Sequence, residues 1–499
     1  MLEPVADMTK SHLDGRPSSN QTAGSGAASG IGGENPAGSA TTLVWFRRDL
    51  RIADHPALRA ALEVSTAVIT VFVWDPTLIA RSGTPRIGFL HGCLASLDHD
   101  LRGASGGGLV QLYGKPDEVL PDLAGRVGAH AVYATGDFGP YGASRDAAAR
   151  SSLARTGIEL RCIGSPYAVA PGVLTNSSGA PFQVYTPYWK AWRSHGWDRP
   201  LAPPGATDLA KITEAGVSGD PRVPRAADFD TPGPMAGERA AHKRLEEFLE
   251  GPVRDYQKHR DLPGVDGTSR LSAFMRFGCL HPRQILARLD PGSPGAEVYE
   301  KELCWREFYA DVLWRRPEAR HLPYRAEWSN LPVDDGPEAD ERFEAWAHGR
   351  TGYPIVDAGM RQLLAEGWMH NRVRMIAASF LIKDLHLDWR RGARWFMDHL
   401  VDADLASNQL GWQWVAGSGN DAAPFFRVFN PTLQGMKFDP DGSYVRRYVP
   451  ELAGLDSRHI HSPHELAGSL LGAPDYPAPI VDHSRERDEA LARYNRMRT

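Results

Sequence analysis

The sequence lacks any hydrophobic run long enough to cross a membrane. Its longest apolar stretch, Ala67 to Trp74, is far shorter than the roughly 20 residues that a membrane-spanning helix needs. Cysteine is also scarce, and the four cysteines lie too far apart for a Cys-x-x-Cys pair or a zinc knuckle. No signal peptide precedes them. We therefore expect no contact with a membrane, reduced thiols and a cytoplasmic location.

An excess of positive charge is absent as well. The chain has 56 Lys and Arg against 61 Asp and Glu, which gives a net charge of -5. The protein as a whole is therefore not a cationic nucleic-acid binder, and any phosphate binding must use a local patch. The 50 glycines and 38 prolines among 499 residues are too few for a low-complexity or collagen-like chain. This composition predicts a globular protein of two or three domains.

The pattern of residues in the first part of the chain changes at Thr41. Residues 1 to 40 are rich in Gly, Ser and Ala and have no hydrophobic period, which predicts a disordered tail. From residue 41 to 170, helix-length segments separate short apolar runs at 43–46, 67–74, 109–113, 129–134 and 159–163. This alternation predicts an α/β domain with a doubly wound parallel sheet and helices on both faces. Ligands are expected at the carboxyl ends of its strands.

The second half of the chain has a different pattern. Seven prolines between Pro200 and Pro234 indicate a domain boundary, and we assign residues 171–235 to an interdomain linker. Over 236–499 the apolar spacing is helical, at 238–250, 297–316, 357–384 and 389–400, which predicts an all-α domain. Nine of the 14 tryptophans lie between Trp305 and Trp414. Core packing is the simplest explanation of such a cluster.

Two predicted helix faces in this domain carry polar and aromatic residues together. Because positions i, i+3, i+4 and i+7 share a face, the two groups are Glu302, Trp305, Arg306 and Tyr309, and Trp368, Asn371, Arg372 and Met375. Such mixtures suit a pocket for a planar, polar ligand better than an apolar core. The alternative for each group is one salt bridge on a solvated helix face.

A hydroxyl-rich run and an acidic pair also stand out. The run from Thr268 to Ser272 is typical of a helix N-cap, and a helix N-terminus can also hold a phosphate. Asp402 and Asp404 have no His or Cys nearby at ligand spacing, which argues against a transition-metal site. We predict no metal, and an arginine or a ribityl hydroxyl as the partner of these carboxylates.

The chain resembles the cryptochrome/photolyase family from Thr41 to about Leu452. The motifs that carry the resemblance are Trp45-Phe46-Arg47-Arg48-Asp49-Leu50-Arg51, Gly267 to Ser272, Trp305-Arg306-Glu307-Phe308-Tyr309, Gly352-Tyr353-Pro354-Ile355-Val356-Asp357, Trp368-Met369-His370-Asn371-Arg372, and Asp402 to Trp414. Within the family, the chain is similar to class I cyclobutane pyrimidine dimer DNA photolyases. The resemblance implies an antenna chromophore in the α/β domain, and FAD and DNA sites in the helical domain.

The resemblance also implies how FAD is held. The matching positions are Tyr256, Thr268, Ser269, Arg270, Leu271, Ser272, Arg374, Asp402, Ala403, Asp404 and Asn408. Arg374 would face Asp402 beside the isoalloxazine, and Asn408 would face flavin N5. A neutral amide there suits a negatively charged reduced flavin better than a carboxylate does.

The activity that the resemblance implies is light-driven repair of cyclobutane pyrimidine dimers in UV-damaged DNA, by electron transfer from excited reduced FAD. The dimer would contact Glu302, Asn371, Met375, Trp305 and Trp414, and the matching DNA-binding positions are Arg260, Glu302, Trp305, Tyr309, Asn371, Arg372, Arg427 and Gln434. Without the resemblance, arginines in such a run are more often part of a solvated face. We expect a monomer whose DNA binding is sensitive to salt.

The chain departs from the family in its electron relay. Trp412 and Trp389 match the proximal and middle tryptophans, but Val333 stands at the distal position. Trp328, five residues earlier, is the candidate substitute. For the antenna, Pro140-Tyr141-Gly142 resembles the members that bind 8-hydroxy-5-deazaflavin, and methenyltetrahydrofolate is the alternative chromophore.

Three other functions are weighed against this interpretation. A (6-4) photolyase would carry His at the positions of Asn371 and Met375. A cryptochrome, which is a blue-light receptor, would more often have another residue at Asn408 and a long regulatory tail. From the residues alone, the alternative is a flavin-dependent oxidoreductase that works in darkness with a nicotinamide donor.

Overall fold

The computed structural model describes residues 40–498 except 215, 217–219, 226–228, 230–235, 422–425 and 467–474. The tail predicted for residues 1 to 40 therefore lies outside the described residues, apart from residue 40. The predicted linker, 171–235, is described in part.

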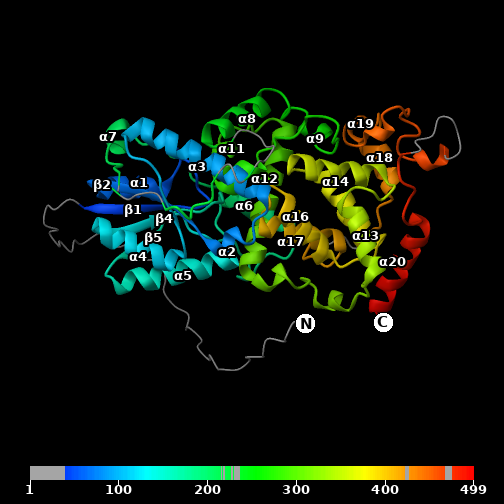
Figure 1. The fold of residues 1–499 in the computed structure, drawn as a ribbon, viewed down its shortest axis with the longest axis horizontal. Coiled ribbons are helices and arrows are strands. Elements are labelled where there is room, and N and C mark those ends of the chain that lie inside the picture. The colour runs from blue at the N-terminus through cyan, green and yellow to red at the C-terminus, as the bar shows by residue number, and fades with distance from the viewer. Residues whose placement is uncertain are drawn as a thin grey trace. The chain divides into compact units, whose positions relative to one another are not determined.

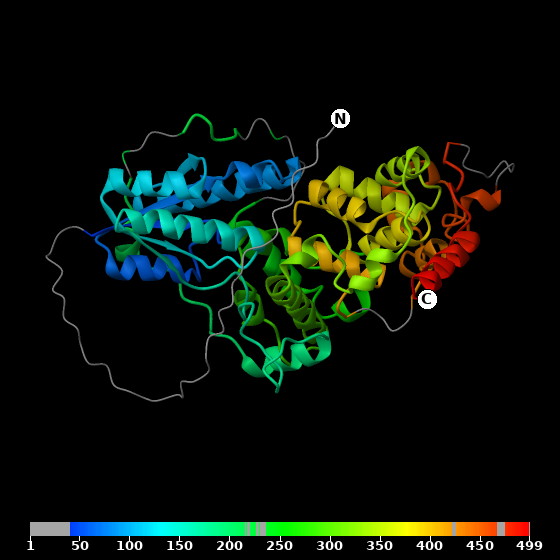
Figure 2. The ribbon, with the colours of Figure 1, turned by 90° about the horizontal axis from the view of Figure 1, so that it is seen from below.

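Five parallel strands form one sheet in the order β3-β2-β1-β4-β5. They are β1 (Thr41–Phe46), β2 (Ala67–Trp74), β3 (Val110–Tyr113), β4 (Ala129–Ala134) and β5 (Glu159–Cys162). Parallel neighbours need crossover helices, which are α1 (Pro56–Val64), α2 (Pro76–Ile79), α3 (Thr84–Ser105), α4 (Pro116–Val127) and α5 (Pro140–Arg155). The helices cover both faces of the sheet (Figures 1 and 2). The predicted α/β class is confirmed.

Alternate residues of β1 face opposite sides of this sheet. Leu43 and Trp45 belong to the core cluster on one face, whereas Val44 and Phe46 belong to the cluster on the other. Both faces are therefore buried, as expected for a parallel sheet covered by helices. The strand order reverses between β1 and β4, so the crevice at their carboxyl ends is a place where such folds bind ligands.

After β5 the described elements are all helices, as predicted for residues 236–499. Its helices are α6 (Tyr185–His195), α7 (Ala206–Leu209), α8 (Glu238–Glu250), α9 (Tyr256–His259), α10 (Ser272–Phe277), α11 (Pro282–Leu286), α12 (Pro294–Arg315), α13 (Pro337–Ala347), α14 (Pro354–Glu366), α15 (Asn371–Lys383), α16 (Trp389–His399), α17 (Leu405–Ala416), α18 (Pro431–Phe438), α19 (Ser443–Tyr448) and α20 (His483–Arg498). Short 3-10 helices are η2 (Pro317–Arg320), η3 (Ala326–Asn330), η4 (Pro450–Leu452) and η5 (Pro463–Leu466). Helices α6 and α7 lie inside the predicted linker.

The helical segment predicted at 357–384 is two helices. Gly367 adopts a left-handed φ of 63° and ends α14, and the His370 side chain accepts a hydrogen bond from the Arg372 N–H and caps α15. Trp368 lies between them, so the prediction that it shares a helix face with Asn371, Arg372 and Met375 is wrong. The chain turns at this point because a glycine and a capping side chain follow each other closely.

Two contacts join the segment after β1 to the helical region. The Leu50 N–H donates to the Phe277 carbonyl over 3.1 Å, and the Arg51 guanidinium donates to the Gly278 carbonyl over 3.0 Å. Gly278 has a φ of 70°, and a Cβ there would lie 1.9 Å from the Arg48 carbonyl oxygen. Only glycine permits this close approach. The contacts bring the residues after β1 next to the loop before α17.

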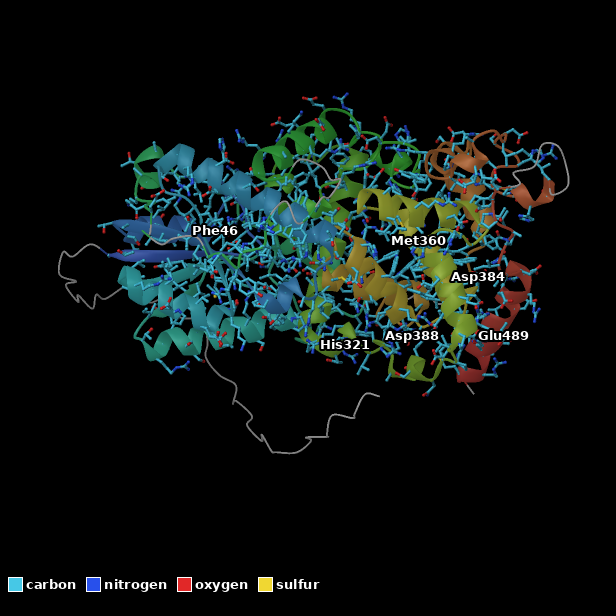
Figure 3. All side chains as sticks on the ribbon, viewed as in Figure 1. Phe46, His321, Met360, Asp384, Asp388 and Glu489 are labelled. Atoms are coloured by element: carbon cyan, nitrogen blue, oxygen red, sulfur yellow. The ribbon has the colours of Figure 1, made fainter. Side chains whose placement is uncertain are left out.

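Buried side chains from both regions form the cores. Phe46, labelled in Figure 3, lies in a cluster that includes residues of α8 and α12, and Met360 lies in a second cluster built by α14, α15 and α16. Within the described part of the chain, no helix is both long and apolar enough to span a membrane.

Candidate cofactor and substrate site

Asp402 lies at the centre of a polar cluster of side chains before α17. Its Oδ2 accepts a hydrogen bond from the Ser272 hydroxyl over 2.6 Å and forms an ion pair with Arg374 over 2.9 Å. Arg374 also donates to the Met369 carbonyl over 2.8 Å, which fixes its guanidinium in place. The other oxygen of Asp402, Oδ1, is enclosed and has no partner among the described residues. A buried carboxylate oxygen normally has a partner, so Oδ1 is available to a ligand.

The loop before α10 is held from behind by Arg244 of α8. The Arg244 guanidinium donates to the carbonyls of Thr268 and Ser269 over 2.8 and 2.9 Å. Ser269 turns its hydroxyl the other way and accepts a hydrogen bond from Tyr299 of α12 over 2.9 Å. Arg244 therefore anchors the backbone of this loop, and Tyr299 of α12 anchors the Ser269 hydroxyl.

The composition of the run from Thr268 to Ser272 predicts a side-chain cap for the next helix, but the run does not supply one. Leu271 occupies the N-cap position of α10, and no side chain bonds there. The Ser272 hydroxyl is used on Asp402 instead. Arg270 has a φ of 52°, which is the left-handed region that favours glycine. Backbone strain of this kind is concentrated at ligand sites.

Asp404 caps α17 and pairs with a residue that follows β1. Its Oδ1 accepts a hydrogen bond from the Ser407 N–H over 3.2 Å, and its Oδ2 lies 2.7 Å from Arg48. Burial raises the pKa of this carboxyl, but the guanidinium groups of Arg48, Arg276 and Arg306 outweigh burial and hold the pKa well below its usual range. Asp404 therefore stays charged at any physiological pH.

Asn408 and Tyr256 are fixed by their neighbours. The Asn408 amide donates to the Ala393 carbonyl of α16 over 3.0 Å. Tyr256 begins α9, is buried, and packs edge-on against Tyr299, with ring centroids 5.2 Å apart. The Arg260 guanidinium lies 5.8 Å from the Tyr256 ring. Tyr256 is therefore the link between the loop at Ser269 and the next group of residues.

Glu302 and Arg260 form the polar part of the second group. Their ion pair is 2.7 Å long, and about a quarter of each side chain is exposed. Burial raises the pKa of Glu302, and the charge of Arg260 opposes that effect. Close by, Arg372 at the start of α15 pairs with Asp261 over 2.9 Å. Two arginines and two acids from three segments thus meet at one partly open place.

Trp305 is stacked on an aromatic ring from α6, which lies in the predicted linker. Its ring lies parallel to that of Tyr185, with centroids 3.7 Å apart, and Tyr309 lies 5.4 Å away. Arg306 is predicted to share this wall, but its long side chain instead reaches the carbonyls of Pro166 and Met275. The wall beside Glu302 is therefore aromatic rather than mixed.

The remaining predicted contact residues are spread along the same region. Asn371 is exposed at the start of α15, and Met375 and Trp414 are half-buried against the second core cluster. Arg427 is exposed and Gln434 is half-buried on α18. No side-chain contact among the described residues joins these last two to Glu302.

The three predicted relay tryptophans are buried but differ in their surroundings. Trp412 packs against Trp346, with ring centroids 6.2 Å apart. Its indole also lies so close to Gly392 that a Cβ added to this glycine would be 2.1 Å from the Cη2 atom of Trp412. Trp389 begins α16. Trp328 packs against Phe426 and Tyr494 instead, at 5.9 and 5.6 Å.

At the carboxyl ends of the strands, Tyr141 donates to Asp75 over 2.5 Å. Arg47 pairs with Asp146 over 2.5 Å, and its Nη2 is enclosed with no partner in the described part of the chain. Within the described residues, no group of three or more His, Cys, Asp or Glu side chains is arranged to hold a metal ion.

Comparison with known proteins places this site in a family. Residues 42–205 match the family described as DNA photolyase, and residues 299–496 match the FAD binding domain of DNA photolyase. A deoxyribodipyrimidine photo-lyase of Synechococcus sp. is 39% identical over 481 residues, which cover 92% of this chain and 97% of the relative. The chain belongs to the DNA photolyase family. Its helical domain is the FAD-binding domain of that family.

Solved structures give the same assignment. A bacterial class III photolyase from Agrobacterium tumefaciens has a TM-score of 0.84 and 38% identity, over 93% of this chain and 99% of that one. A cryptochrome of Synechocystis sp. has a TM-score of 0.83 and 28% identity, over 91% and 99%. Membership of the photolyase family is therefore clear, whereas the class I subtype stays a prediction.

The residues around Asp402 fit the flavin that the family binds. The free Oδ1 of Asp402, the anchored loop at Ser269 and the left-handed Arg270 are features of a ligand cradle. Arg374 supplies a fixed positive charge beside them. These residues come from three segments, which are the loop before α10, the start of α15 and the loop before α17.

Sequence reasoning misses the roles of two residues in this photolyase site. Arg48 belongs to the motif after the first strand, but only the fold shows that it pairs with Asp404. Tyr185 lies in the predicted linker, yet it stacks on Trp305. The aromatic run Tyr185-Thr-Pro-Tyr-Trp was a usable signal, since a linker rarely concentrates aromatic residues.

Proposed function

We propose that this enzyme, a deoxyribodipyrimidine photo-lyase by family, repairs cyclobutane pyrimidine dimers in UV-damaged DNA under light. The observation that carries the proposal is the ion pair of Glu302 with Arg260 on the helix that also carries the stacked Trp305. FAD, when bound and reduced, supplies the electron that opens the cyclobutane ring. The residues that would hold it are Tyr256, Thr268, Ser269, Arg270, Leu271, Ser272, Arg374, Asp402, Ala403, Asp404 and Asn408.

Glu302 is the proposed hydrogen-bonding group for the dimer. Because burial raises the pKa of its carboxyl, the proton stays on Glu302 at higher pH than on an exposed glutamate. A protonated carboxyl can donate to a carbonyl oxygen of the dimer and stabilise negative charge that develops there. Arg260 orients Glu302, because its Nη1 donates a hydrogen bond to Glu302 Oε1 over 2.7 Å.

The aromatic wall serves the flipped dimer. Extruding a damaged base pair costs a few kcal/mol, least where pairing is already weakened. Trp305 is held rigid by Tyr185, which stacks 3.7 Å behind it, so it offers a preformed face for stacking. Met375, Trp414 and Asn371 complete the proposed dimer site.

The DNA backbone is the proposed partner of the remaining predicted residues. These residues are Arg260, Arg372, Arg427, Gln434 and Tyr309. Within the chain, we assign residues 41–170 to the antenna domain, 171–235 to the connecting segment and 236–499 to FAD and DNA. We infer a monomer.

The antenna domain is proposed to hold 8-hydroxy-5-deazaflavin, with methenyltetrahydrofolate as the alternative. Tyr141 and the charged groups around Arg47 lie at the strand ends where such folds bind ligands. The absorption spectrum of the purified protein distinguishes the two chromophores from each other and from an FAD-only protein.

Lesion choice tests the function. We expect reduced enzyme under blue light to restore thymines from cyclobutane dimers and to leave (6-4) products unchanged. Glu302→Gln keeps the size of the side chain and can donate a hydrogen bond, whereas Glu302→Ala removes it and should lower the repair yield much more. Removing such a hydrogen bond typically costs about 1–3 kcal/mol. Repair of both lesions, or equal yields in wild type and Glu302→Ala, contradicts the proposal.

A signalling role is the second candidate, because the Synechocystis cryptochrome has nearly the same fold. A receptor would bind flavin and respond to light without repairing either lesion. The repair assay therefore decides between the two functions.

A further inference from the structure

The C-terminal helix α20 is attached to the helical domain at two distant points along its length. The Oε2 atom of Glu486, near the start of α20, lies 2.8 Å from Nε2 of His386, which follows α15. Arg493, further along α20, pairs with Asp334, which precedes α13, over 2.6 Å. Helix α20 lies beside α13 (Figure 1), and residues of the two helices line one cavity. These contacts hold α20 in a fixed position on the domain.

Tyr494 of α20 contacts the residue that precedes Arg427. The rings of Tyr494 and Phe426 are nearly parallel, with an interplanar angle of 3° and centroids 4.7 Å apart. Trp328 of η3 packs against both rings, at 5.6 Å from Tyr494 and 5.9 Å from Phe426. Aromatic rings in contact contribute free energy beyond the area that they bury. Phe426 is therefore held by rings from two other segments of the chain.

Lys383, the last residue of α15, contacts the same short segment. Its ammonium group donates a hydrogen bond to the Arg427 carbonyl and lies 4.6 Å from the centroid of the Phe426 ring. The Lys383 side chain is buried, and burial lowers its pKa to about 7 against the opposing charge of Asp384. A buried ammonium group is costly unless its contacts compensate. The contacts with Phe426 and Arg427 supply such compensation.

These contacts act on the main chain of Arg427 and on its neighbour, and they leave the Arg427 side chain uncommitted. That side chain is exposed and has no ion pair with a described residue. An arginine whose main chain is already fixed loses less conformational freedom when it binds a phosphate. The anchors at Tyr494 and Lys383 therefore prepare Arg427 for an anionic partner.

We propose that Tyr494 and Lys383 are positioning residues for DNA binding, because they fix the backbone at Phe426 and Arg427 and so present the Arg427 guanidinium to a DNA phosphate. The inference rests on the proposed function, in which Arg427 is a DNA contact. It gives the C-terminal helix a part in substrate binding, although α20 lies after the last motif that carries the family resemblance. Without the anchors Arg427 still reaches a phosphate but has to be ordered first, so binding weakens without being lost.

The affinity for a dimer-containing duplex tests the two anchors. Tyr494→Ala, Tyr494→Leu and Lys383→Met should each weaken binding several-fold, measured by fluorescence anisotropy. The slope of log affinity against log salt should fall by up to about 1, as for the partial loss of one phosphate contact. Tyr494→Phe keeps the stacked ring and should bind as wild type does. Lys115→Met makes the same change in charge as Lys383→Met at an exposed position before α4 and should also leave the affinity unchanged.

Double variants show whether the anchors act through Arg427. Arg427→Gln alone should weaken binding, and adding Tyr494→Ala or Lys383→Met to it should cause little further loss. Losses that add in full would overturn the proposal, because the anchors would then act elsewhere. Wild-type affinity in Arg427→Gln, or in both Tyr494→Ala and Lys383→Met, would overturn it as well.

Trypsin cleavage after Arg427 reports on the anchors without DNA. A protease cleaves a folded chain where the chain opens locally. Tyr494→Ala and Lys383→Met should therefore speed cleavage after Arg427 several-fold, measured by mass spectrometry of the fragments, and Tyr494→Phe should not. Cleavage after Arg126 of α4 is the internal control for a general loss of stability. Unchanged cleavage after Arg427 in both variants, or an equal increase at Arg126, would overturn the positioning role.

Repair assays separate this inference from the proposed function. With chemically reduced enzyme, Tyr494→Ala should raise the DNA concentration that half-saturates repair by the same factor as it weakens binding. The repair yield at saturating DNA should fall much less. A loss confined to the yield at saturation contradicts a role in binding. If reduced wild type repairs no dimers, the proposed function is refuted, and the anisotropy and trypsin measurements still decide whether Tyr494 and Lys383 position Arg427.

Discussion

At the scale of single residues, the site depends on groups that are only partly satisfied. Asp402 uses one oxygen for Ser272 and Arg374, and its other oxygen has no partner in the part of the chain that the structure describes. Asp404, by contrast, is fully occupied by Arg48 and the start of α17. We infer that Asp404 holds the two parts of the chain together, whereas Asp402 is the residue that meets the cofactor.

Asp402→Asn tests this difference. The amide keeps the shape of the side chain but loses the charge opposite Arg374 and one acceptor oxygen. We expect the purified variant to retain much less FAD, measured by absorption of the supernatant after denaturation. The free energy of unfolding should fall by about 1.5–3 kcal/mol, the range for hydrogen bonds to charged groups. Asp122→Asn, an exposed position on α4, is the control, and unchanged FAD content in Asp402→Asn would show that Asp402 does not touch the cofactor.

At the scale of elements, the start of α15 carries a titratable cap. His370 is 2% exposed, and its Nδ1 accepts a hydrogen bond from the Arg372 N–H over 3.2 Å. Its Nε2 is enclosed and has no partner among the residues that the structure describes. Burial lowers the pKa of His370 to about 4. Protonation would charge a buried ring, and on Nδ1 it would also remove the cap from the helix that presents Asn371.

This cap predicts a loss of stability in mild acid. In the unfolded chain His370 takes up a proton below about pH 6.5, but the folded chain resists until about pH 4. The unfolded state binds more protons in this window, so the free energy of unfolding falls as pH falls, by up to about 3 kcal/mol. Urea unfolding at pH 7 and pH 5 measures it. His370→Asn keeps a capping oxygen and should lose less stability between the two pH values, and equal losses would contradict the prediction.

The elements also show how far the sequence could predict the fold. The five strand runs and the start of α16 at Trp389 are confirmed closely, because parallel strands and amphipathic helices leave local periodic patterns. The break at Gly367 is missed, since the apolar spacing continues across it and no proline marks it. The contact between Tyr185 and Trp305 has no local pattern at all, because it depends on how α6 packs against α12.

At the scale of the whole molecule, a net charge of -5 is set against a polyanionic substrate. DNA binding must therefore depend on local arginines, and these differ in whether a carboxylate already pairs with them. The Arg427 side chain is exposed and has no ion pair with a described residue. Arg372 is paired with Asp261 over 2.9 Å, so a phosphate has to displace a carboxylate before it gains that contact.

This competition predicts that removing an acid strengthens DNA binding more than its charge alone explains. Asp261→Asn releases Arg372 and should tighten binding to dimer-containing duplex several-fold, measured by fluorescence anisotropy at several salt concentrations. Asp122→Asn makes the same change in net charge on α4 and should leave the affinity nearly unchanged. Arg427→Gln should weaken binding and reduce the slope of log affinity against log salt by about 1, as expected for the loss of one phosphate contact. If Asp261→Asn and Asp122→Asn have the same effect, the overall charge governs binding, and Arg372 does not take part in a local exchange of partners.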